Sequence, residues 1–332
     1  MAPYFENSCD SLVADALMGL ARTHTDLLSL DTDHWFLRAR DTAPSRRVGL
    51  LSGGGAGHEP LHTGFVGRGM LDVACPGRVF ASPHNRQVYE GSLAAAGPGG
   101  VLHIVKNYTG DRINFGIAAE RLAHRGIPCA RVLVDDDLAS DSEEIAAGRR
   151  GTGGTVLIEK ILGGAADSGL GLAELQELGT GLAARCRTLA VASAAHTSPA
   201  TGEPAFRLGP DEIEYGVGIH GERARDTVSR GPLGPLVRRM TGELLEALAP
   251  GPGAQVITLV NGLGAVTPLE LYAVHRELGR ALDERSVGLA RSLVGEYITA
   301  LDMRGFSVTL LIADPTVLTY YDAPVRTAAL RW

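Results

Sequence analysis

The sequence predicts an α/β protein with two domains, each built from a mostly parallel or mixed sheet flanked by helices. Apolar runs of strand length alternate along the chain with longer segments of helical periodicity, which is typical of parallel pairing. Several of these runs end in glycine-rich or charged turns, the position where sheets of this class bind ligands. Since 332 residues is long for one domain, we expect domains at 1–184 and 185–332, with the C-terminal tail able to pack back on the first.

The first half is expected to begin with a helix and to continue as strands that run into turns and helices. Apolar residues at helical spacing predict the helix over 11–29, and the run 48–51 indicates a buried strand that enters a glycine turn and then a helix. Later patterns in this half predict strands at 101–105 and 131–134, and helices over 113–125, from 156–158 onward and over 172–186.

The second half repeats the alternation. Its apolar runs precede polar or glycine-bearing turns and predict strands at 188–193, 214–219, 256–260 and 307–312. Helices are expected over 236–248 and from Pro268, because proline suits the first turn of a helix. Proline and glycine over 198–210 indicate a long loop.

The composition indicates an ordinary globular protein with neither nucleic acid nor membrane as a partner. The net charge of −7 and the lack of a basic stripe argue against nucleic acid. No basic N-terminal region precedes an apolar stretch, and no window holds 18 uncharged apolar residues. The four cysteines are far apart and form no C-x-x-C pair, so we expect a reduced, cytoplasmic protein.

The stretch 50–60 carries the strongest local signal for a ligand site. Four glycines fill five positions over 53–57, and a histidine and a glutamate follow, so backbone N–H groups and two reactive side chains can approach a ligand. The dinucleotide and P-loop patterns both fail, the first because His58 stands where the third glycine belongs. His58 to His62 satisfies the zinc-protease pattern H-E-x-x-H, but Pro60 and the glycine turn disfavour the helix that this pattern requires.

Other candidate residues follow predicted strands. His220 lies beside a glycine at the end of a short apolar run; a hydrogen-bonded turn histidine is the alternative, but neutral imidazole can also form covalent intermediates. Lys106 and Asp111 are suited to oxyanion binding and general-base chemistry, with a structural ion pair as the alternative. The acidic run 135–137 fits either Mg²⁺ binding or helix capping, and capping is favoured.

Seven segments carry a recognisable pattern in a fixed order, and they are 52–60, 106–111, 216–222, 261–264, 294–297, 301–303 and 322–332. This pattern resembles the K subunit of dihydroxyacetone kinases, from the first predicted helix to the last residue. The resemblance implies a two-domain α/β subunit, usually homodimeric, that binds dihydroxyacetone and belongs to an enzyme transferring a phosphoryl group to an alcohol.

The resemblance also implies a role for each candidate residue. His220 adds to the substrate carbonyl and gives a covalent hemiaminal, which glycerol cannot form because it has no carbonyl. Asp111 accepts the proton of the terminal hydroxyl as it attacks phosphorus, and His58 orients or assists. The positions expected to contact the substrate are Gly55, Lys106, Gly54 and Ser82. No residue is assigned to a metal.

The resemblance places the nucleotide on another protein. Phosphoryl transfer needs phosphate clamps and usually Mg²⁺, and the sequence shows neither a P-loop nor a convincing metal cluster. We therefore expect no cofactor on this chain and a partner, the L subunit, that carries ATP·Mg²⁺ or an ADP·Mg²⁺ recharged from the phosphoenolpyruvate phosphotransferase system. The chain stops at Trp332, so a fused nucleotide domain is not expected.

Departures from the family pattern leave the substrate open. Ser82 stands where threonine is frequent in the family, and Arg223 and Ala224 replace Pro-Gly. Erythrulose or another small ketose is therefore an alternative substrate, and a non-catalytic ketose-sensing coactivator is an alternative function. The presence of both His58 and Asp111 favours the enzyme, because a sensor needs no base.

Overall fold

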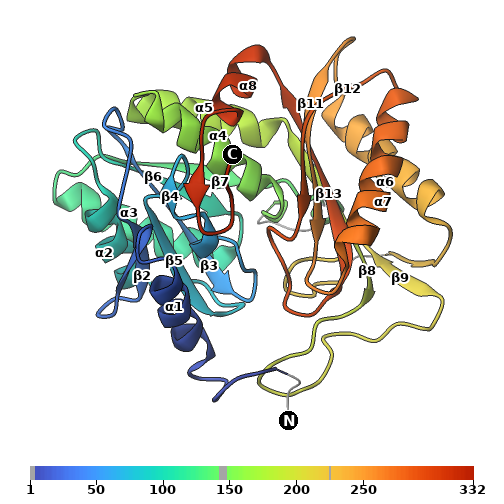
Figure 1. The fold of residues 1–332 in the computed structure, drawn as a ribbon, viewed down its shortest axis with the longest axis horizontal. Helices are drawn as coiled ribbons and strands as arrows, with labels where there is room; N and C mark the ends of the chain where they lie inside the picture. The colour runs from blue at the N-terminus through green and yellow to red at the C-terminus, as the bar shows by residue number, and fades with distance from the viewer. Residues whose placement is uncertain (1–3, 142–147, 224–225) are drawn as a thin grey trace. The chain divides into compact units, whose positions relative to one another are not determined.

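The computed structural model describes residues 4–141, 148–223 and 226–332, which form two compact units (Figure 1). The N-terminal unit comprises Phe5–Val134, Thr155–Ala183 and Val317–Trp332. The C-terminal unit comprises Asp135–Gly154 and Ala184–Thr316, together with Tyr4. The chain thus passes between units at Ala184, where a boundary is expected, but it also does so near residues 135, 154 and 317.

The N-terminal unit is built on a six-stranded sheet with the order β1-β2-β5-β3-β6-β7. The four strands from β5 to β7 pair in parallel, and β1 and β2 add an antiparallel edge. The strands are β1 (Leu28–Asp31), β2 (Phe36–Ala39), β3 (Gly49–Ala56), β5 (Val73–Val79), β6 (Val101–Lys106) and β7 (Cys129–Val134). A small second sheet pairs β4 (Gly67–Arg68) with β14 (Arg326–Thr327).

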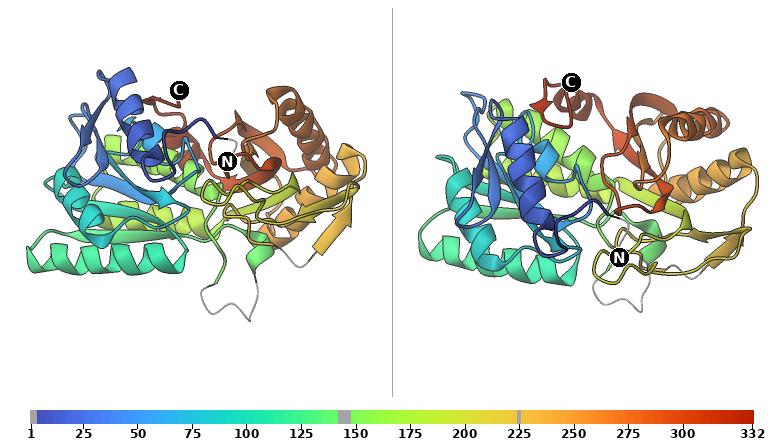
Figure 2. Two further views of the ribbon diagram at one scale, coloured as in Figure 1. Left: turned by 90° about the horizontal axis from the view of Figure 1, so that it is seen from below. Right: turned by 60° about the horizontal axis from the view of Figure 1, so that its bottom comes forward.

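Six helices of the described chain accompany the sheet of the N-terminal unit. They are α1 (Leu12–Thr23), α2 (Asn85–Ala95), α3 (Thr109–His124), α4 (Gly154–Asp167), α5 (Leu172–Ala184) and α8 (Pro315–Tyr321), with a 3-10 turn η1 (Thr63–Phe65). Figures 1 and 2 show α2 and α3 side by side against one face of the sheet. There Phe115 and Val88 pack with Leu51 and Val105 of the strands in one buried cluster. Alternation along a strand sends Ser52 to the opposite face.

The C-terminal unit has a mixed six-stranded sheet with the order β10-β9-β8-β13-β11-β12. Among its described strands, β11 and β12 pair in parallel and the other neighbours pair antiparallel. The strands are β8 (Cys186–Ala194), β9 (Glu212–Tyr215), β10 (Asp226–Ser229), β11 (Gln255–Gly262), β12 (Gly288–Gly295) and β13 (Arg304–Ala313). Helices α6 (Leu233–Leu248) and α7 (Pro268–Asp283) lie side by side on one face of this sheet (Figure 1), and a 3-10 turn, η2 (Leu138–Ser140), precedes them in the chain.

The prediction of a glycine turn over 53–57 is wrong for its first three glycines, which belong to a strand. Gly53, Gly54 and Gly55 are extended residues of β3, and of this stretch only Gly57 has a positive φ, of 95°. The strand uses glycines because neighbouring groups come close: a Cβ on Gly53 would lie 2.4 Å from the carbonyl oxygen of Cys75. The helix expected next is also absent, since η1, β4 and β5 follow β3.

Other boundaries differ from expectation by a few residues. The predicted helix over 11–29 ends at Thr23, and its final residues contribute to β1. Helix α3 begins at Thr109 instead of 113, which puts Asp111 in its first turn. Strand β9 ends at Tyr215, so His220 follows a loop. Within the described ranges, no helix has the length and apolar character to cross a membrane.

Candidate functional site

Lys106 and Gly54 lie against one another in the N-terminal unit. Lys106 is the last residue of β6 and is only 1% exposed. A Cβ added to Gly54 would stand 2.1 Å from Lys106 Nζ. The ammonium therefore occupies the space that a side chain on β3 would need, and the two predicted substrate-binding positions form one feature.

The loop after β5 gathers three further predicted residues. The ring of His58 stacks on Phe80, with centroids 4.9 Å apart. Gly55 faces the same loop, because a Cβ there would lie 2.7 Å from Phe80 Cα. Ser82 reaches the first turn of α3, where its Oγ is 2.6 Å from the position of a Cβ on Gly110. The loop therefore connects the end of β3 with the start of α3.

Asp111 is buried in the first turn of α3, with 3% of its surface exposed. Its Oδ1 has no hydrogen-bond partner in the described part of the chain. The N-terminus of a helix stabilises a carboxylate, and a buried acceptor without a partner is suited to a ligand's hydroxyl. Burial lowers the pKa of Lys106, while the negative charges of Asp111 and Glu159 raise it.

A buried polar chain behind Lys106 was not predicted. Lys106 Nζ lies 2.8 Å from His62 Nε2, and His62 Nδ1 lies 2.6 Å from Glu159 Oε1. Ser52 Oγ is 3.0 Å from the same Nδ1 and donates to the Ile104 carbonyl. His62 was part of the H-E-x-x-H pattern but received no role, and nothing in the sequence separates Glu159 from an ordinary helix residue.

Burial controls the ionisation of this chain. It lowers the pKa of His62, and the positive charges of Lys106 and His58 lower it further. Burial also raises the pKa of the Glu159 carboxyl, whereas a hydrogen bond from Ser52 and the positive charge of Lys106 lower it. His62 is therefore neutral at physiological pH.

The zinc-protease interpretation is not supported by the local structure. His58 and His62 are separated by turns and do not lie on one face of a helix. Among the described residues, no group of three or more His, Cys, Asp or Glu is arranged to hold a metal ion.

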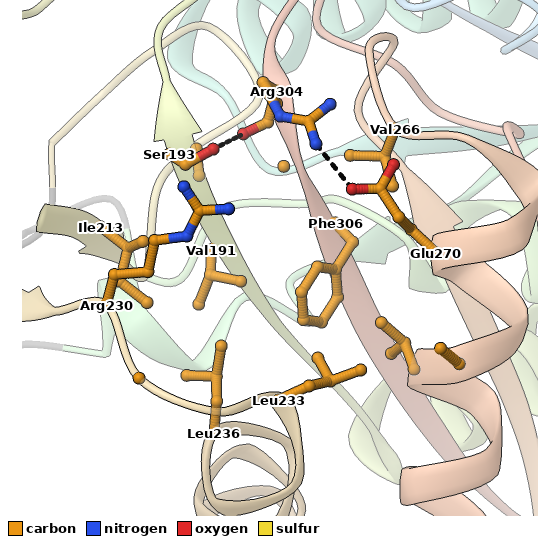
Figure 3. Close-up of a pocket in the computed structure, with 15 residues that line it drawn as sticks. Val191, Ser193, Ile213, Arg230, Leu233, Leu236, Val266, Glu270, Arg304 and Phe306 are labelled. Carbon is orange, nitrogen blue, oxygen red and sulfur yellow. Dashed lines mark hydrogen bonds and ion pairs between the residues drawn. The ribbon is translucent and has the colours of Figure 1, made fainter. Parts of the chain in front are cut away.

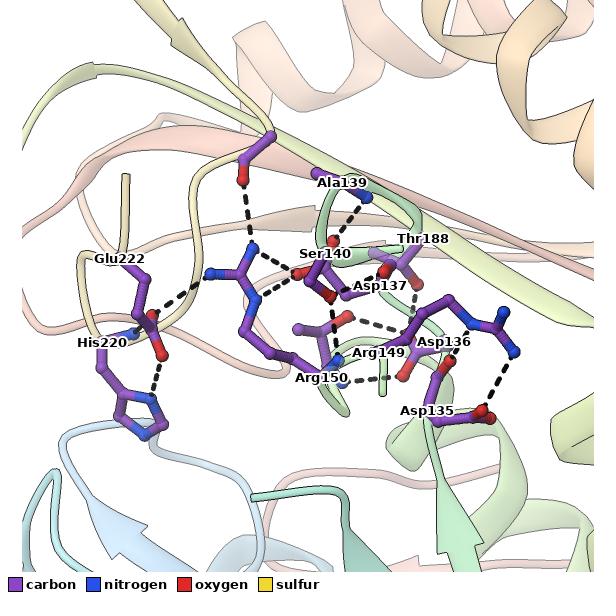
Figure 4. A network of polar contacts seen from close by, with 12 residues as sticks. Asp135, Asp136, Asp137, Ala139, Ser140, Arg149, Arg150, Thr188, His220 and Glu222 are labelled. Carbon is purple, nitrogen blue, oxygen red and sulfur yellow. Dashed lines mark hydrogen bonds and ion pairs between the residues drawn. The ribbon is translucent and has the colours of Figure 1, made fainter. Parts of the chain in front are cut away.

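His220 belongs to the C-terminal unit, where Glu222 holds it (Figure 4). Glu222 Oε1 is 3.0 Å from His220 Nδ1, and Oε2 accepts a hydrogen bond of 2.9 Å from the His220 backbone N–H. Arg150 lies between two carboxylates, with Nη1 3.9 Å from Glu222 Oε2 and Nε donating to Asp137 Oδ2 at 2.7 Å. A Cβ on Gly218 would lie 2.1 Å from Glu222 Oε2, so this glycine makes room for the carboxylate.

These contacts set the state of His220. Burial opposes ionisation of Glu222, but the hydrogen bond and charge of His220 and the charge of Arg150 lower its pKa to about 2. A carboxylate at Nδ1 accepts a hydrogen bond from the ring N–H there, so in the tautomer that Glu222 selects the lone pair lies on Nε2. Glu222 was not among the predicted site residues, although it lies two positions from His220.

The acidic run caps helix termini, as expected, and also forms ion pairs. Asp136 accepts hydrogen bonds of 2.7 Å from the backbone N–H groups of Thr152 and Gly154, at the start of α4, and also bonds the Thr188 hydroxyl. Asp135 pairs with Arg149 at 2.9 Å. The bond to Thr188 of β8 links the segment Asp135–Gly154 to the C-terminal unit.

One departure from the family pattern can be located. Arg223 pairs with the buried carboxylate of Glu214 at 3.0 Å, so it is tied to the C-terminal sheet. Ala224 lies outside the described residues.

Two cavities lie away from the predicted residues. One, of about 270 Å³, lies over the C-terminal sheet near Phe306 and Leu233 and carries Arg230 and an Arg304–Glu270 ion pair of 2.6 Å (Figure 3). The other, of about 280 Å³, lies beside β2 and α2 in the N-terminal unit. None of the seven predicted site residues lines either cavity.

Comparison with known proteins identifies the family. The Dak1 domain model matches residues 18–329. The chain is 40% identical to the Escherichia coli K12 "PEP-dependent dihydroxyacetone kinase, dihydroxyacetone-binding subunit DhaK", over 98% of both chains.

Two solved structures share the fold. The dihydroxyacetone kinase from C. freundii in complex with AMP-PNP and Mg²⁺ matches with a TM-score of 0.88 and 34% identity, over 100% of this chain and 61% of that chain. The dihydroxyacetone kinase operon co-activator Dha-DhaQ matches with a TM-score of 0.89 and 30% identity, over 95% of this chain and 97% of that chain. The chain therefore belongs to the Dak1 domain family, which confirms the resemblance to the K subunits of dihydroxyacetone kinases.

Proposed function

We propose that this chain is the substrate-binding subunit of a dihydroxyacetone kinase, and that it binds dihydroxyacetone covalently through His220. The relative from E. coli, named as such a subunit, supports the proposal because the two proteins align over 98% of each. The observation that carries it is the contact of Glu222 with His220 Nδ1 at 3.0 Å, which makes Nε2 the nucleophilic atom.

The covalent step follows from that tautomer. Nε2 attacks the carbonyl carbon, a C–N bond forms, and the π electrons of the carbonyl move to oxygen, which takes up a proton. The ring releases its Nδ1 proton to water by way of Glu222, and the alkoxide oxygen takes its proton from water, so the net result is addition of imidazole N–H across the C=O bond. Glu222 therefore favours the reaction by stabilising the ring as its charge develops.

Phosphorylation uses groups of the N-terminal unit. Asp111 accepts the proton of the terminal hydroxyl as that oxygen attacks phosphorus, and its unpartnered Oδ1 supports this role. Lys106 donates to a substrate oxygen, while His58, Ser82 and the β3 glycines shape the site. His58 orients or assists at the hydroxyl.

The phosphoryl donor is proposed to lie on a partner subunit that carries the nucleotide with Mg²⁺. The "PEP-dependent" relative supports a donor recharged from phosphoenolpyruvate, and the AMP-PNP complex of the C. freundii enzyme supports a nucleotide in the reaction. We also propose that the chain forms a homodimer and acts in the cytoplasm. Erythrulose is the alternative ketose substrate.

A ketose-sensing coactivator is the second candidate function. The likeness to the operon co-activator, at 30% identity, favours it. The buried base Asp111 favours the kinase, because reversible addition of a carbonyl to His220 does not require a second base at the hydroxyl.

A labelling experiment tests the covalent step. Protein with ¹⁵N-histidine and dihydroxyacetone labelled with ¹³C at the carbonyl should show a one-bond ¹³C–¹⁵N coupling, which hydration of the ketone cannot produce. The coupling should vanish in His220→Ala and persist in the control His24→Ala, at the end of α1. A bound ketose that shows no coupling in the wild-type protein would refute the covalent claim.

A further inference from the structure

The contacts behind Lys106 form a continuous chain of side chains from four elements of the N-terminal unit. Glu159 comes from α4, His62 from the turn before η1, Lys106 from β6 and Ser52 from β3. All four are buried, with exposures of 0%, 4%, 1% and 0%. The distances of 2.6 Å and 2.8 Å on the two sides of the imidazole are short enough for strong hydrogen bonds.

Donor and acceptor chemistry orders the protons in this chain. A lysine ammonium has only donors, so His62 Nε2 must accept from Lys106. The single ring proton then lies on Nδ1 and is donated to Glu159 Oε1. Ser52 Oγ lies 3.0 Å from the same Nδ1 and 2.7 Å from the Ile104 carbonyl oxygen, so it packs beside the His62–Glu159 bond.

Glu159 supplies a negative charge that Asp111 cannot supply throughout turnover. The ionisable groups facing Lys106 are Asp111 from α3, Glu159 from α4 and His62, and His58 acts on His62 through its charge. In the proposed reaction Asp111 takes up a proton and loses its charge. The 2.6 Å bond to His62 Nδ1–H and the charge of Lys106 favour the ionised form of Glu159, which then remains as the carboxylate that stabilises the buried ammonium.

We propose that Glu159 and His62 are positioning residues that keep Lys106 charged and hold its Nζ over Gly54, where it donates to a substrate oxygen. This inference rests on the proposed function in taking Lys106 as a ligand of the ketose. His62 fixes the position of the ammonium, and Glu159 fixes the tautomer of His62. Neither residue contacts the substrate.

The chain offers a direct spectroscopic test, because Lys106 and Lys160 are its only lysines. In protein with ¹³C-lysine, the two Cε signals can be assigned with Lys106→Arg and titrated between about pH 6 and 11. A lysine is charged below its pKa, so removal of a nearby carboxylate lowers the pH at which it loses its proton. We expect Glu159→Gln to lower the Lys106 midpoint by about one pH unit or more. Lys160, which donates to the Tyr321 carbonyl, serves as an internal reference.

Substrate affinity gives the second readout. Binding of dihydroxyacetone should weaken as pH rises through the Lys106 midpoint, and Glu159→Gln and His62→Gln should weaken it about tenfold or more at neutral pH. Glu159→Asp retains the charge and should keep the midpoint nearer that of the wild type. The control is His103→Asn. His103 is buried in β6, the strand of Lys106, and bonds Ser92, so its substitution should leave both readouts unchanged.

The outcomes separate this inference from the proposed function. An unchanged Lys106 midpoint in folded Glu159→Gln would overturn it, as would an equal loss of affinity in His103→Asn. If Glu159→Gln does not fold, dihydroxyacetone affinity is measured in Glu159→Asp and His62→Gln. An affinity equal to that of the wild type in either variant would then overturn the inference. Failure of the wild-type protein to bind any ketose would refute the proposed function, and the lysine titration alone would then decide the role of Glu159.

Discussion

Asp111 and Lys106 differ in how many of their hydrogen-bond and charge partners the protein supplies. The Lys106 ammonium bonds His62 and is stabilised by the negative charges of Asp111 and Glu159. By contrast, Asp111 Oδ1 has no hydrogen-bond partner in the described ranges. A buried acceptor left in this state costs free energy unless a ligand supplies the donor. We therefore assign the proton-accepting role to Asp111 and the charge-stabilising role to Lys106.

This assignment predicts a separation of binding from turnover in Asp111→Asn. The amide has nearly the same shape and can still hydrogen-bond a hydroxyl, so dihydroxyacetone should bind with little change. Turnover should fall by about 10²–10⁴-fold, because the amide cannot take up the proton. Dihydroxyacetone phosphate formation would be measured with the partner subunit present, with Asp283→Asn at the end of α7 as the control. Unchanged turnover in Asp111→Asn would show that another group is the base.

The sequence marked candidate site residues where they belong to an unusual motif. His58, His220 and the β3 glycines stand out because glycine and histidine together have few structural explanations. Glu222 and Glu159 were missed, because a glutamate near a turn or in a helix is usually a solvated surface residue. Only the fold shows that Glu159 is buried against His62.

Among the elements, β3 shows how glycine serves a site without forming a turn. Three successive glycines extend the strand to Ala56, and each one permits a different close approach. Glycine is depleted in strands, so the local pattern could predict the apolar start of β3 but not its extension. Helix α7 was easier to predict because Pro268 suits the first turn of a helix, and the structure adds a Thr267–Glu270 capping box at the same terminus.

The approaches at β3 predict different effects for alanine at two adjacent glycines. A Cβ at Gly54 meets the movable end of Lys106, so Gly54→Ala should displace the ammonium and weaken ketose binding about tenfold or more, with little loss of stability. A Cβ at Gly53 meets the backbone oxygen of Cys75 at 2.4 Å, so Gly53→Ala should destabilise the protein by about 1–3 kcal/mol.

Calorimetric binding and thermal unfolding of both variants would check this contrast. Gly116→Ala is the control, because a Cβ at this position of α3 has no neighbour within 4 Å. It should stabilise the protein by about 0.5–1 kcal/mol and leave binding unchanged. Equal effects of Gly53→Ala and Gly54→Ala on binding would contradict the placement of Lys106 over Gly54.

At the scale of the whole molecule, the sequence predicted the α/β class, two sheets and a C-terminal tail able to pack on the first domain, but not that Asp135–Gly154 joins the C-terminal unit. The tail Val317–Trp332 is held in the N-terminal unit, where Lys160 Nζ lies 4.7 Å from the Trp332 ring and bonds the Tyr321 carbonyl. In the C-terminal unit, the Thr188 backbone N–H bonds the Asp136 carbonyl at 2.8 Å. Such pairings join residues far apart in the chain, and the local periodicity of the sequence does not predict them.

The proposed division of labour between subunits predicts an activity that appears only on mixing. This chain aligns over 98% of both proteins with a relative named as a dihydroxyacetone-binding subunit, so it should bind the ketose alone and release no dihydroxyacetone phosphate with ATP·Mg²⁺ or phosphoenolpyruvate. Adding a nucleotide-carrying partner subunit should give product at a rate that saturates as the partner is increased. The Asp111→Asn protein should compete for the partner and lower the rate of a wild-type mixture, because its surface is otherwise unchanged. A coupled assay for dihydroxyacetone phosphate measures both effects, and product from the chain alone would refute the need for a partner.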